Sequence, residues 1–180
     1  MTLQERFIQE IAPRLAKELE LKNLLAVPRM TATTVSVGLS AGLKDPKFLE
    51  VAENVLMRIT GQRPVRTKAK KSIASFKLRK GMIVGMRVTL RGARMWHFLD
   101  KLINVTLPRV RDFRGIPLSQ VDSSGSLSIG LREFLAFPEI RPDEVERVHG
   151  LQITLTTKSG SREQGIALLT ALGCPFSRSK

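Results

Sequence analysis

The chain has 180 residues, 42% of them hydrophobic, and a formal net charge of +14 from 30 Lys and Arg against 16 Asp and Glu. This length and apolar content are enough for one globular core, which excludes a disordered basic tail. A single cysteine excludes an internal disulfide, and two histidines leave no zinc-ligand spacing, so we expect neither a metal nor a cofactor. The longest apolar runs are shorter than a membrane span and no signal peptide is recognisable, so we expect a soluble intracellular protein without a membrane partner.

The first predicted element is an N-terminal helix. Thr2 and Glu5 have the spacing of a capping box, which predicts the start of the helix. Apolar residues then recur every four positions and predict one buried stripe: Leu3, Phe7, Ile11, Leu15 and Leu19. Pro13 lacks a backbone N–H, so it should kink or divide this helix.

A strand and a second helix follow. From Thr33 to Leu39 the hydrophobic period becomes two, which predicts a strand with one apolar face and one small polar face, the latter including Thr34 and Ser36. Asp45 is a suitable N-cap, Pro46 suits a first helical turn, and Gly61 suits the position after a helix end. We therefore predict a helix between Asp45 and Gly61.

Residues 64–67 predict a short strand, and the dense positive charge from Lys68 to Lys80 predicts an exposed loop. Residues 82–91 predict a long strand in which apolar positions alternate with Gly85, Arg87, Thr89 and Arg91.

The second part of the chain predicts a helix over 94–104 closed by Pro108, a mobile loop over 117–128, a strand over 151–156 and a last helix from Ser161 to Gly173. Half-polar strands interspersed with helices favour an α+β fold. We expect an antiparallel or mixed sheet with helices packed on one face and a long basic loop between strands. Residues 1–180 should form a single domain, with core halves of roughly 1–92 and 93–180.

The charge is concentrated in one stretch of the sequence. The 46 residues between Glu53 and Asp100 contain no acidic residue but seven arginines and five lysines. Like charges gathered in one place destabilise a compact state, so such a stretch indicates an anionic partner. Nucleic acid is the commonest one.

The polar strand faces and the basic loop provide a candidate binding surface. Guanidinium forks and hydroxyls suit phosphates and ribose 2′-hydroxyls. The candidate residues are Thr34, Ser36, Arg66, Lys68, Lys70, Lys71, Arg87, Thr89 and Arg91. The chain has no tyrosine and one tryptophan, so base stacking should contribute little, and recognition of a folded RNA by shape and backbone is expected.

Two other classes of function remain open at this point. An RNA-modifying or RNA-cleaving enzyme would need titratable groups beside the basic face, and the acid-free stretch supplies no carboxylate there. His97 is expected to have a surface or packing role and Cys174 to be a small buried hydrophobe, so we predict no enzyme. A general RNA chaperone, or a DNA-compacting or other non-specific nucleic-acid-binding protein, is the second alternative.

Several long motifs resemble one protein family. They are ITGQRPVRTKAKKSIASFKLR at residues 59–79, VTLRG at 88–92, LPRVRDFRG at 107–115 and FPEI at 137–140. In this order they are similar to the bacterial-type large-subunit ribosomal protein that binds 5S ribosomal RNA, universal protein number five. The resemblance runs from Val27 to Phe176, which is nearly the whole chain.

This resemblance implies a structural protein of the central protuberance of the large ribosomal subunit, in a cytoplasmic or organellar ribosome. Its polar sheet face would bind 5S rRNA, with Gln62, Thr89, Lys68 and Arg91 among the contacts. Its basic loop would contact the P-site tRNA through Phe76, Lys77, Arg79 and Lys80. Large-subunit rRNA and a small-subunit head protein would be further partners, the latter bound near residues 115–130, and no homo-oligomer is expected.

Two positions depart from the family pattern. Ser36 stands where the family usually has asparagine, so an amide that both donates and accepts hydrogen bonds is lost, and the contact there should be weaker or water-mediated. Residues 122–125 read Asp-Ser-Ser-Gly where the family commonly has Asp-Gly-Arg-Gly, so the local contacts of this loop should also differ.

Overall fold

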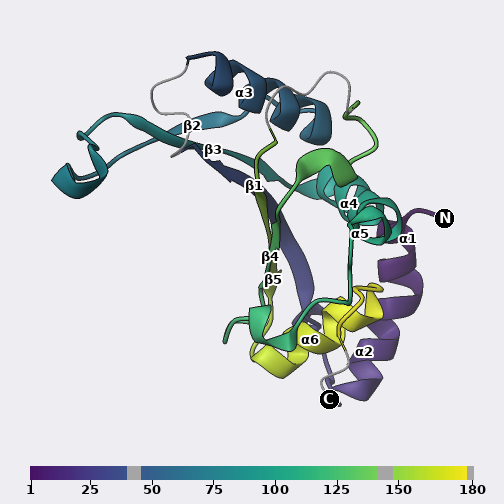
Figure 1. The fold of residues 1–180 in the computed structure, drawn as a ribbon. Coiled ribbons are helices and arrows are strands. Elements are labelled where there is room, and N and C mark those ends of the chain that lie inside the picture. Colours follow the sequence, from purple (N-terminus) through teal and green to yellow (C-terminus); the bar gives the residue numbers. More distant parts are fainter. Residues whose placement is uncertain (40–45, 142–147, 178–180) are drawn as a thin grey trace. The chain divides into compact units, whose positions relative to one another are not determined.

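The computed structural model describes residues 1–39, 46–141 and 148–177. It confirms the α+β class: five strands form one antiparallel sheet in the order β2-β3-β1-β5-β4 (Figure 1). The strands are β1 Arg29–Gly38, β2 Val65–Lys68, β3 Ile83–Leu90, β4 Leu127–Leu131 and β5 Leu151–Lys158. The α-helical segments are α1 Leu3–Arg6, α2 Ala12–Glu18, α3 Pro46–Thr60, α4 Gly92–Lys101, α5 Leu107–Arg109 and α6 Arg162–Ala171.

The residues group into two compact units, each made of discontinuous segments. Unit 1 comprises Met1–Thr33, Leu90–Ile129 and Thr154–Lys180, and unit 2 comprises Thr34–Thr89 and Gly130–Ile153. Strands β1, β3, β4 and β5 therefore each contribute residues to both units. Neither unit is a contiguous half of the chain, and the single domain with halves 1–92 and 93–180 stays a prediction.

Unit 1 contains two helices that accommodate a proline by the same device. The predicted capping box is present, because Thr2 N donates to Glu5 Oε2 at 2.9 Å and Glu5 N donates to Thr2 Oγ1 at 3.3 Å. Before Pro13, the helix widens into a π turn over Phe7–Ile11. A second π turn, Leu102–Thr106, precedes Pro108. Because proline cannot donate to the preceding turn, the wide turn makes room for its ring without ending the helix.

Helix packing in unit 1 follows from these continuous helices. Helix α1 packs on α4, and α2 packs on α6. The rings of Phe7 and Trp96 lie 5.2 Å apart. The second helical run continues to Arg109, beyond the predicted end at residue 104, because Pro108 lies inside its last segment rather than after it.

In unit 2, α3 covers one face of the sheet. Its buried side chains are Phe48, Ala52, Val55, Leu56 and Ile59. Gly61 ends the helix with a φ of +66° and donates its N–H to Met57 O at 2.8 Å, which confirms the predicted C-terminal glycine. The predicted N-cap, Asp45, lies outside the described residues.

The alternation of the strands is confirmed where it matters for the polar face. On β1, Val35 and Val37 are buried, whereas Thr34 and Ser36 are half-buried. On β3, Met86 and Val88 are buried and Arg87 is exposed. One set of side chains thus supplies the core and leaves the other set on the opposite face.

Two predicted loops are hydrogen-bonded in the structure, and one strand was missed. The basic loop continues the β2–β3 hairpin, as described below. Over the predicted loop 117–128, Asp122 N donates to Ser126 O at 2.9 Å, and Thr157 Oγ1 donates to Gly125 O at 2.9 Å. Strand β4 went unrecognised because its first residues lie in this Ser- and Gly-rich stretch.

Gly85 lies where β3 approaches its neighbours most closely. A Cβ added there would be 2.8 Å from Val37 O and 3.0 Å from Thr67 Oγ1. The replacement Gly85→Ala should lower the free energy of unfolding by about 1–3 kcal/mol, because the Val37 oxygen belongs to the backbone and cannot rotate away. Urea denaturation measures the change. Gly38→Ala is the control, since a Cβ on Gly38 meets nothing within 4 Å, and equal losses for both variants would contradict the close approach.

His149 predicts a pH dependence of stability. The buried ring lies 4.4 Å from the ring of Phe134 and 5.8 Å from that of Phe48, and its Nε2 has no partner among the described residues. Desolvation by burial lowers the pKa of His149 below 6.5, against the opposing effect of the hydrogen bond to Gly150 O.

Because the folded-state pKa is lowered, the unfolded chain binds this proton more readily, and stability should fall as pH drops below about 6.5. In His149→Phe, the loss of unfolding free energy between pH 7 and pH 5.5 should be smaller than in the wild type, as measured by urea denaturation. The exposed His97 supplies the control variant His97→Gln. An unchanged pH dependence in His149→Phe would refute this role.

Candidate nucleic-acid interface

The face of the unit 2 sheet opposite α3, here called the open face, carries a mixture of hydroxyls and cations. The β2–β3 register pairs Val65 with Arg87 and Thr67 with Gly85. Directly paired residues of antiparallel strands share a face, so Val65 and Thr67 lie on the open face with Arg87. From β1 and β3, the alternation adds Thr34, Ser36 and Thr89.

Strand β5 extends this face. Ser36 Oγ donates to Gln152 O at 3.4 Å, and the exposed Gln152 lies between the buried Leu151 and Ile153. Ser36 lacks the side-chain amide of the family's usual asparagine, but Gln152 on the neighbouring strand provides an amide on the same face. The alternation of Gln152 with the apolar Leu151 and Ile153 was the sequence signal that places Gln152 on the polar face. Gln152 was not included among the predicted binding residues because that part of the chain has no cluster of charges.

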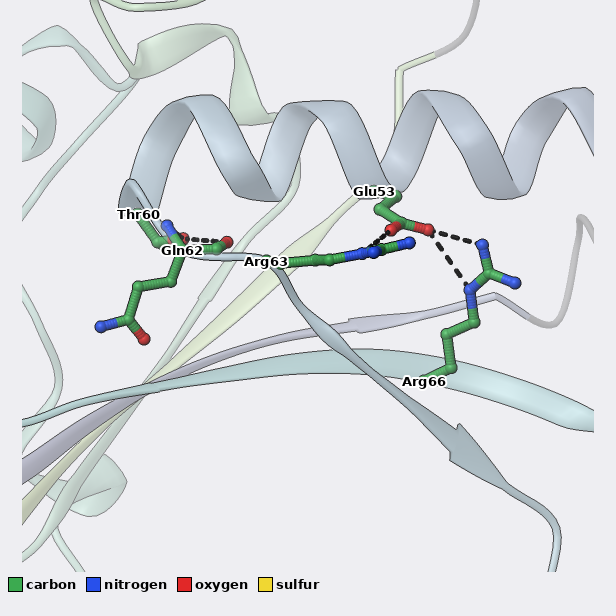
Figure 2. Close-up of polar contacts among 5 residues, drawn as sticks. All are labelled: Glu53, Thr60, Gln62, Arg63 and Arg66. Atoms are coloured by element: carbon green, nitrogen blue, oxygen red, sulfur yellow. Dashed lines mark hydrogen bonds and ion pairs between the residues drawn. The ribbon is translucent and has the colours of Figure 1, made fainter.

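Arg66 does not join the open face. Its register partner is Met86, which is buried, so its side chain is directed to the side of α3. There, Arg66 Nη2 lies 2.7 Å from Glu53 Oε2, and Arg63 Nε lies 3.0 Å from Glu53 Oε1 (Figure 2). The two arginines hold the pKa of Glu53 below its usual value of 4.5, chiefly through the hydrogen bonds from Arg66 and then Arg63.

Arg66, a predicted RNA-binding residue, therefore lies on the α3 side of the sheet rather than on the open face, and Arg63 beside it was not among the predicted residues. The Glu53 carboxylate stands at the boundary of the acid-free stretch, one residue before it begins. Glu53 lies on α3, ten and thirteen residues before its two partners, so no local sequence pattern indicates the contact.

Gln62 is fixed at the end of α3. The Thr60 hydroxyl donates to Leu56 O at 2.6 Å and accepts from Gln62 N at 3.3 Å. The Gln62 side chain points away from Glu53 and its two arginines, as Figure 2 shows. Its amide group is thereby left for another partner.

Lys68 and Arg91 lie at strand ends. Lys68 is exposed at the end of β2, where the register shifts after Thr67. Arg91 is exposed, immediately follows β3 and is the residue before the first turn of α4 in unit 1. Both side chains are available to an anion.

The predicted basic loop is an ordered hairpin tip, defined here as residues 69–82. Ala69 N donates to Met82 O at 2.8 Å, and Ile73 and Leu78 exchange two backbone hydrogen bonds of 3.0 and 3.1 Å. Between them, a 3-10 turn over Ala74–Phe76 leads to Lys77, whose φ of +54° lies in the left-handed region. Figure 1 shows the tip at the far end of the hairpin from α3.

The tip combines cations with exposed apolar side chains. Phe76 is 69% exposed. Two hydrogen bonds from backbone N–H groups to side chains fix the C-terminal side of the tip. Lys80 N donates to Ser72 Oγ at 3.0 Å, and Arg79 N donates to Met82 Sδ at 3.2 Å. The exposed cations are Lys70, Lys71, Lys77, Arg79 and Lys80. Lys70 and Lys71 thus belong to the tip with the predicted tRNA-binding residues rather than to the open face.

The described residues offer no catalytic constellation. Cys174 is buried, and burial raises the pKa of its thiol to about 12, so it is not a nucleophile. His97 is exposed. No group of three metal-ligating side chains occurs among residues 1–39, 46–141 and 148–177. In the same residues, no helix is long and apolar enough to span a bilayer.

Comparisons with known proteins identify the family. The model of the ribosomal protein L5 family matches residues 23–79, and the model of the C-terminus of the same ribosomal family matches residues 83–176. The chain is 47% identical over 176 residues to the large ribosomal subunit protein uL5 of Halothermothrix orenii, covering 98% of both chains. It is 46% identical over 176 residues to that of Thermotoga maritima, covering 98% of this chain and 96% of the relative.

The match covers the motifs quoted above, and the α+β architecture agrees with the fold they implied. The resemblance inferred from the sequence is thus confirmed. The chain belongs to the ribosomal protein L5 family, and it is a structural constituent of the large ribosomal subunit rather than an enzyme.

Proposed function

We propose that this protein binds 5S rRNA through the open face of unit 2 and helps to attach it to the central protuberance. The observation that carries the proposal is the arrangement of Arg87 among the hydroxyls of Thr34, Ser36, Thr67 and Thr89 on one face, with a buried core behind them. A guanidinium fork suits phosphate, and hydroxyls suit ribose 2′-hydroxyls, so such a face recognises an RNA backbone.

Lys68 at the end of β2 and Gln62 after the end of α3 supply further polar groups in unit 2, and Arg91, which follows β3, is proposed as a contact from unit 1. This kind of binding does not require aromatic side chains on which bases stack, which agrees with the absence of tyrosine from the chain. The contacts would fix the RNA by its shape and its phosphates, and release of counterions would supply much of the affinity.

The hairpin tip has a separate role in this proposal, which is to contact the P-site tRNA. Five exposed cations and the exposed Phe76 lie on the internally hydrogen-bonded hairpin tip, so the tip can approach a second RNA without losing much conformational freedom. This role follows from the family resemblance, and the order of the tip supports it.

A contact with the small-subunit head is proposed for residues 115–130, of which 115–129 belong to unit 1. This segment is fixed at several points: Arg162 Nη2 donates to Leu118 O at 2.7 Å, and Ser159 Oγ donates to Ser124 O at 2.7 Å. The exposed side chains of Ser123 and Ser124 are left at its surface. A fixed polar turn can serve as a docking point for another protein.

Selective binding of 5S rRNA is the first test of this proposal. Labelled 5S rRNA should stay bound at moderate salt when unrelated duplex DNA is added in excess. If about six phosphates are neutralised, log affinity should fall with log salt at a slope of roughly −4 to −5. Equal competition by duplex DNA would instead indicate a general nucleic-acid chaperone, and a flat salt response would contradict the electrostatic mechanism.

The open face and the tip should be separable by mutation. Arg87→Ala should weaken 5S rRNA binding by about 1.5–3 kcal/mol, the range for a hydrogen bond to a charged group, and should leave tRNA binding unchanged. The double variant Lys77→Ala and Arg79→Ala should do the reverse. Filter binding with each RNA measures both effects.

Arg94→Ala is the matched charge control, because Arg94 is an exposed arginine on α4 that is absent from both proposed surfaces. If it weakens 5S rRNA binding as much as Arg87→Ala does, net charge rather than the open face determines the affinity. Equal losses of both RNAs in every variant would refute the division of roles.

A further inference from the structure

An acidic side chain lies between two arginines on the α3 side of the sheet. Glu53 on α3 is 11% exposed at its side chain, and its two carboxylate oxygens bind two different arginines. We propose that Glu53, Arg63 and Arg66 form a preassembled phosphate-binding element, the arginine pair, in which Glu53 is a positioning residue. This inference rests on the proposed binding of 5S rRNA and adds a contact outside the open face.

Each arginine binds Glu53 through only part of its guanidinium group. Arg63 uses Nε, so both of its terminal nitrogens are left without a partner among the described residues. Arg66 uses Nε and Nη2, at 3.3 and 2.7 Å from Glu53 Oε2, and its Nη1 is likewise left over. Figure 2 shows the two guanidinium groups next to each other below the carboxylate.

The remaining donors face solvent rather than the core. The Arg63 side chain is 79% exposed and that of Arg66 is 45% exposed. An ion pair that only tied α3 to β2 would need Arg66 alone. The largely exposed Arg63 adds two terminal nitrogens without a hydrogen-bond partner among the described residues, next to the guanidinium group of Arg66.

Charge balance favours an additional anion. Two guanidinium groups held together repel each other, and one carboxylate offsets one of the two charges. The lowered pKa of Glu53 keeps that carboxylate ionised at neutral pH. The arginine pair therefore retains one positive charge in a fixed place, which is the arrangement that binds a phosphate with little loss of side-chain freedom.

The position in the sheet identifies the ligand as the RNA backbone. Arg66 belongs to β2, which is the edge strand of the sheet, and the exposed Lys68 and the hairpin tip follow it along the chain. An RNA strand that leaves the open face past this edge would bring a phosphate to the arginine pair. The ligand of the arginine pair would thus be a backbone phosphodiester that accepts hydrogen bonds from the guanidinium nitrogens.

The variant Glu53→Gln tests positioning because charge and positioning predict opposite results. Removal of a negative charge next to a polyanion site should, by charge alone, tighten the binding of 5S rRNA. If Glu53 positions the arginine pair, binding should instead weaken about fivefold, the size expected for a contact in a coupled network. The affinity is measured on full-length protein with a 5S rRNA transcript, after a thermal melt confirms folding.

Two further variants separate positioning from fold stability. Glu50→Gln removes the same charge from α3 at an exposed residue, and it should leave binding unchanged or tighten it. Arg63→Lys keeps Glu53 and the net charge but has only one nitrogen, so it cannot bind the carboxylate through Nε and a phosphate through Nη at once. It should weaken binding about threefold without a loss of thermal stability.

Adding Glu53→Gln to an Arg63→Ala, Arg66→Ala background should no longer weaken binding, and should leave it unchanged or tighten it as Glu50→Gln does, because Glu53 positions only these two arginines. Equal or tighter binding by Glu53→Gln, or wild-type affinity in Arg63→Lys, would overturn the inference. If the wild type does not prefer 5S rRNA to duplex DNA, the proposed function fails instead, and the two failures are thereby distinguished.

Discussion

The two-residue alternation of β3 is the constraint on which the rest of the structure depends. Met86 and Val88 must enter the core of unit 2, and this requirement places Arg87 and Thr89 on the opposite face. A slip of one residue would bury a guanidinium and expose the apolar row, so the register is fixed by the core. Gly85 adds a second restriction, because a side chain there would meet the Val37 carbonyl oxygen. The geometry of the polar face is thus a consequence of core packing on its other side.

The same constraint divides the positive charge into separate groups. Arg87 lies on the open face, five cations lie on the hairpin tip, and Arg63 and Arg66 lie together at Glu53 on the side of α3. Self-repulsion within the acid-free stretch is limited because the hairpin carries much of the charge to its exposed tip. One nearly buried carboxylate compensates the two arginines closest to the helix. Each group therefore presents a different chemistry to RNA, although all of them come from one continuous stretch of sequence.

Sequence reasoning predicted most of the fold because the periodic signals were strong and local. The capping box at Thr2, the end of α3 at Gly61 and the alternation of β1 and β3 all depend on residues close together in the chain. The failures concern contacts between distant residues. The contact of Arg66 with Glu53 joins β2 to α3, and the order of the hairpin tip depends on bonds such as that from Lys80 to Ser72. Strand β4 contains Ser128 and Gly130, so its short alternating pattern resembled the loop before it.

The central claim is that RNA binds the face opposite α3, and methyl NMR tests it most directly. Val65 is 64% exposed on the open face, whereas Val88, on the neighbouring strand, is 3% exposed in the core. When 5S rRNA is added to protein labelled at its valine methyl groups, the Val65 signals should shift and broaden while those of Val88 keep their positions. Unchanged Val65 signals in a saturated complex would contradict the account.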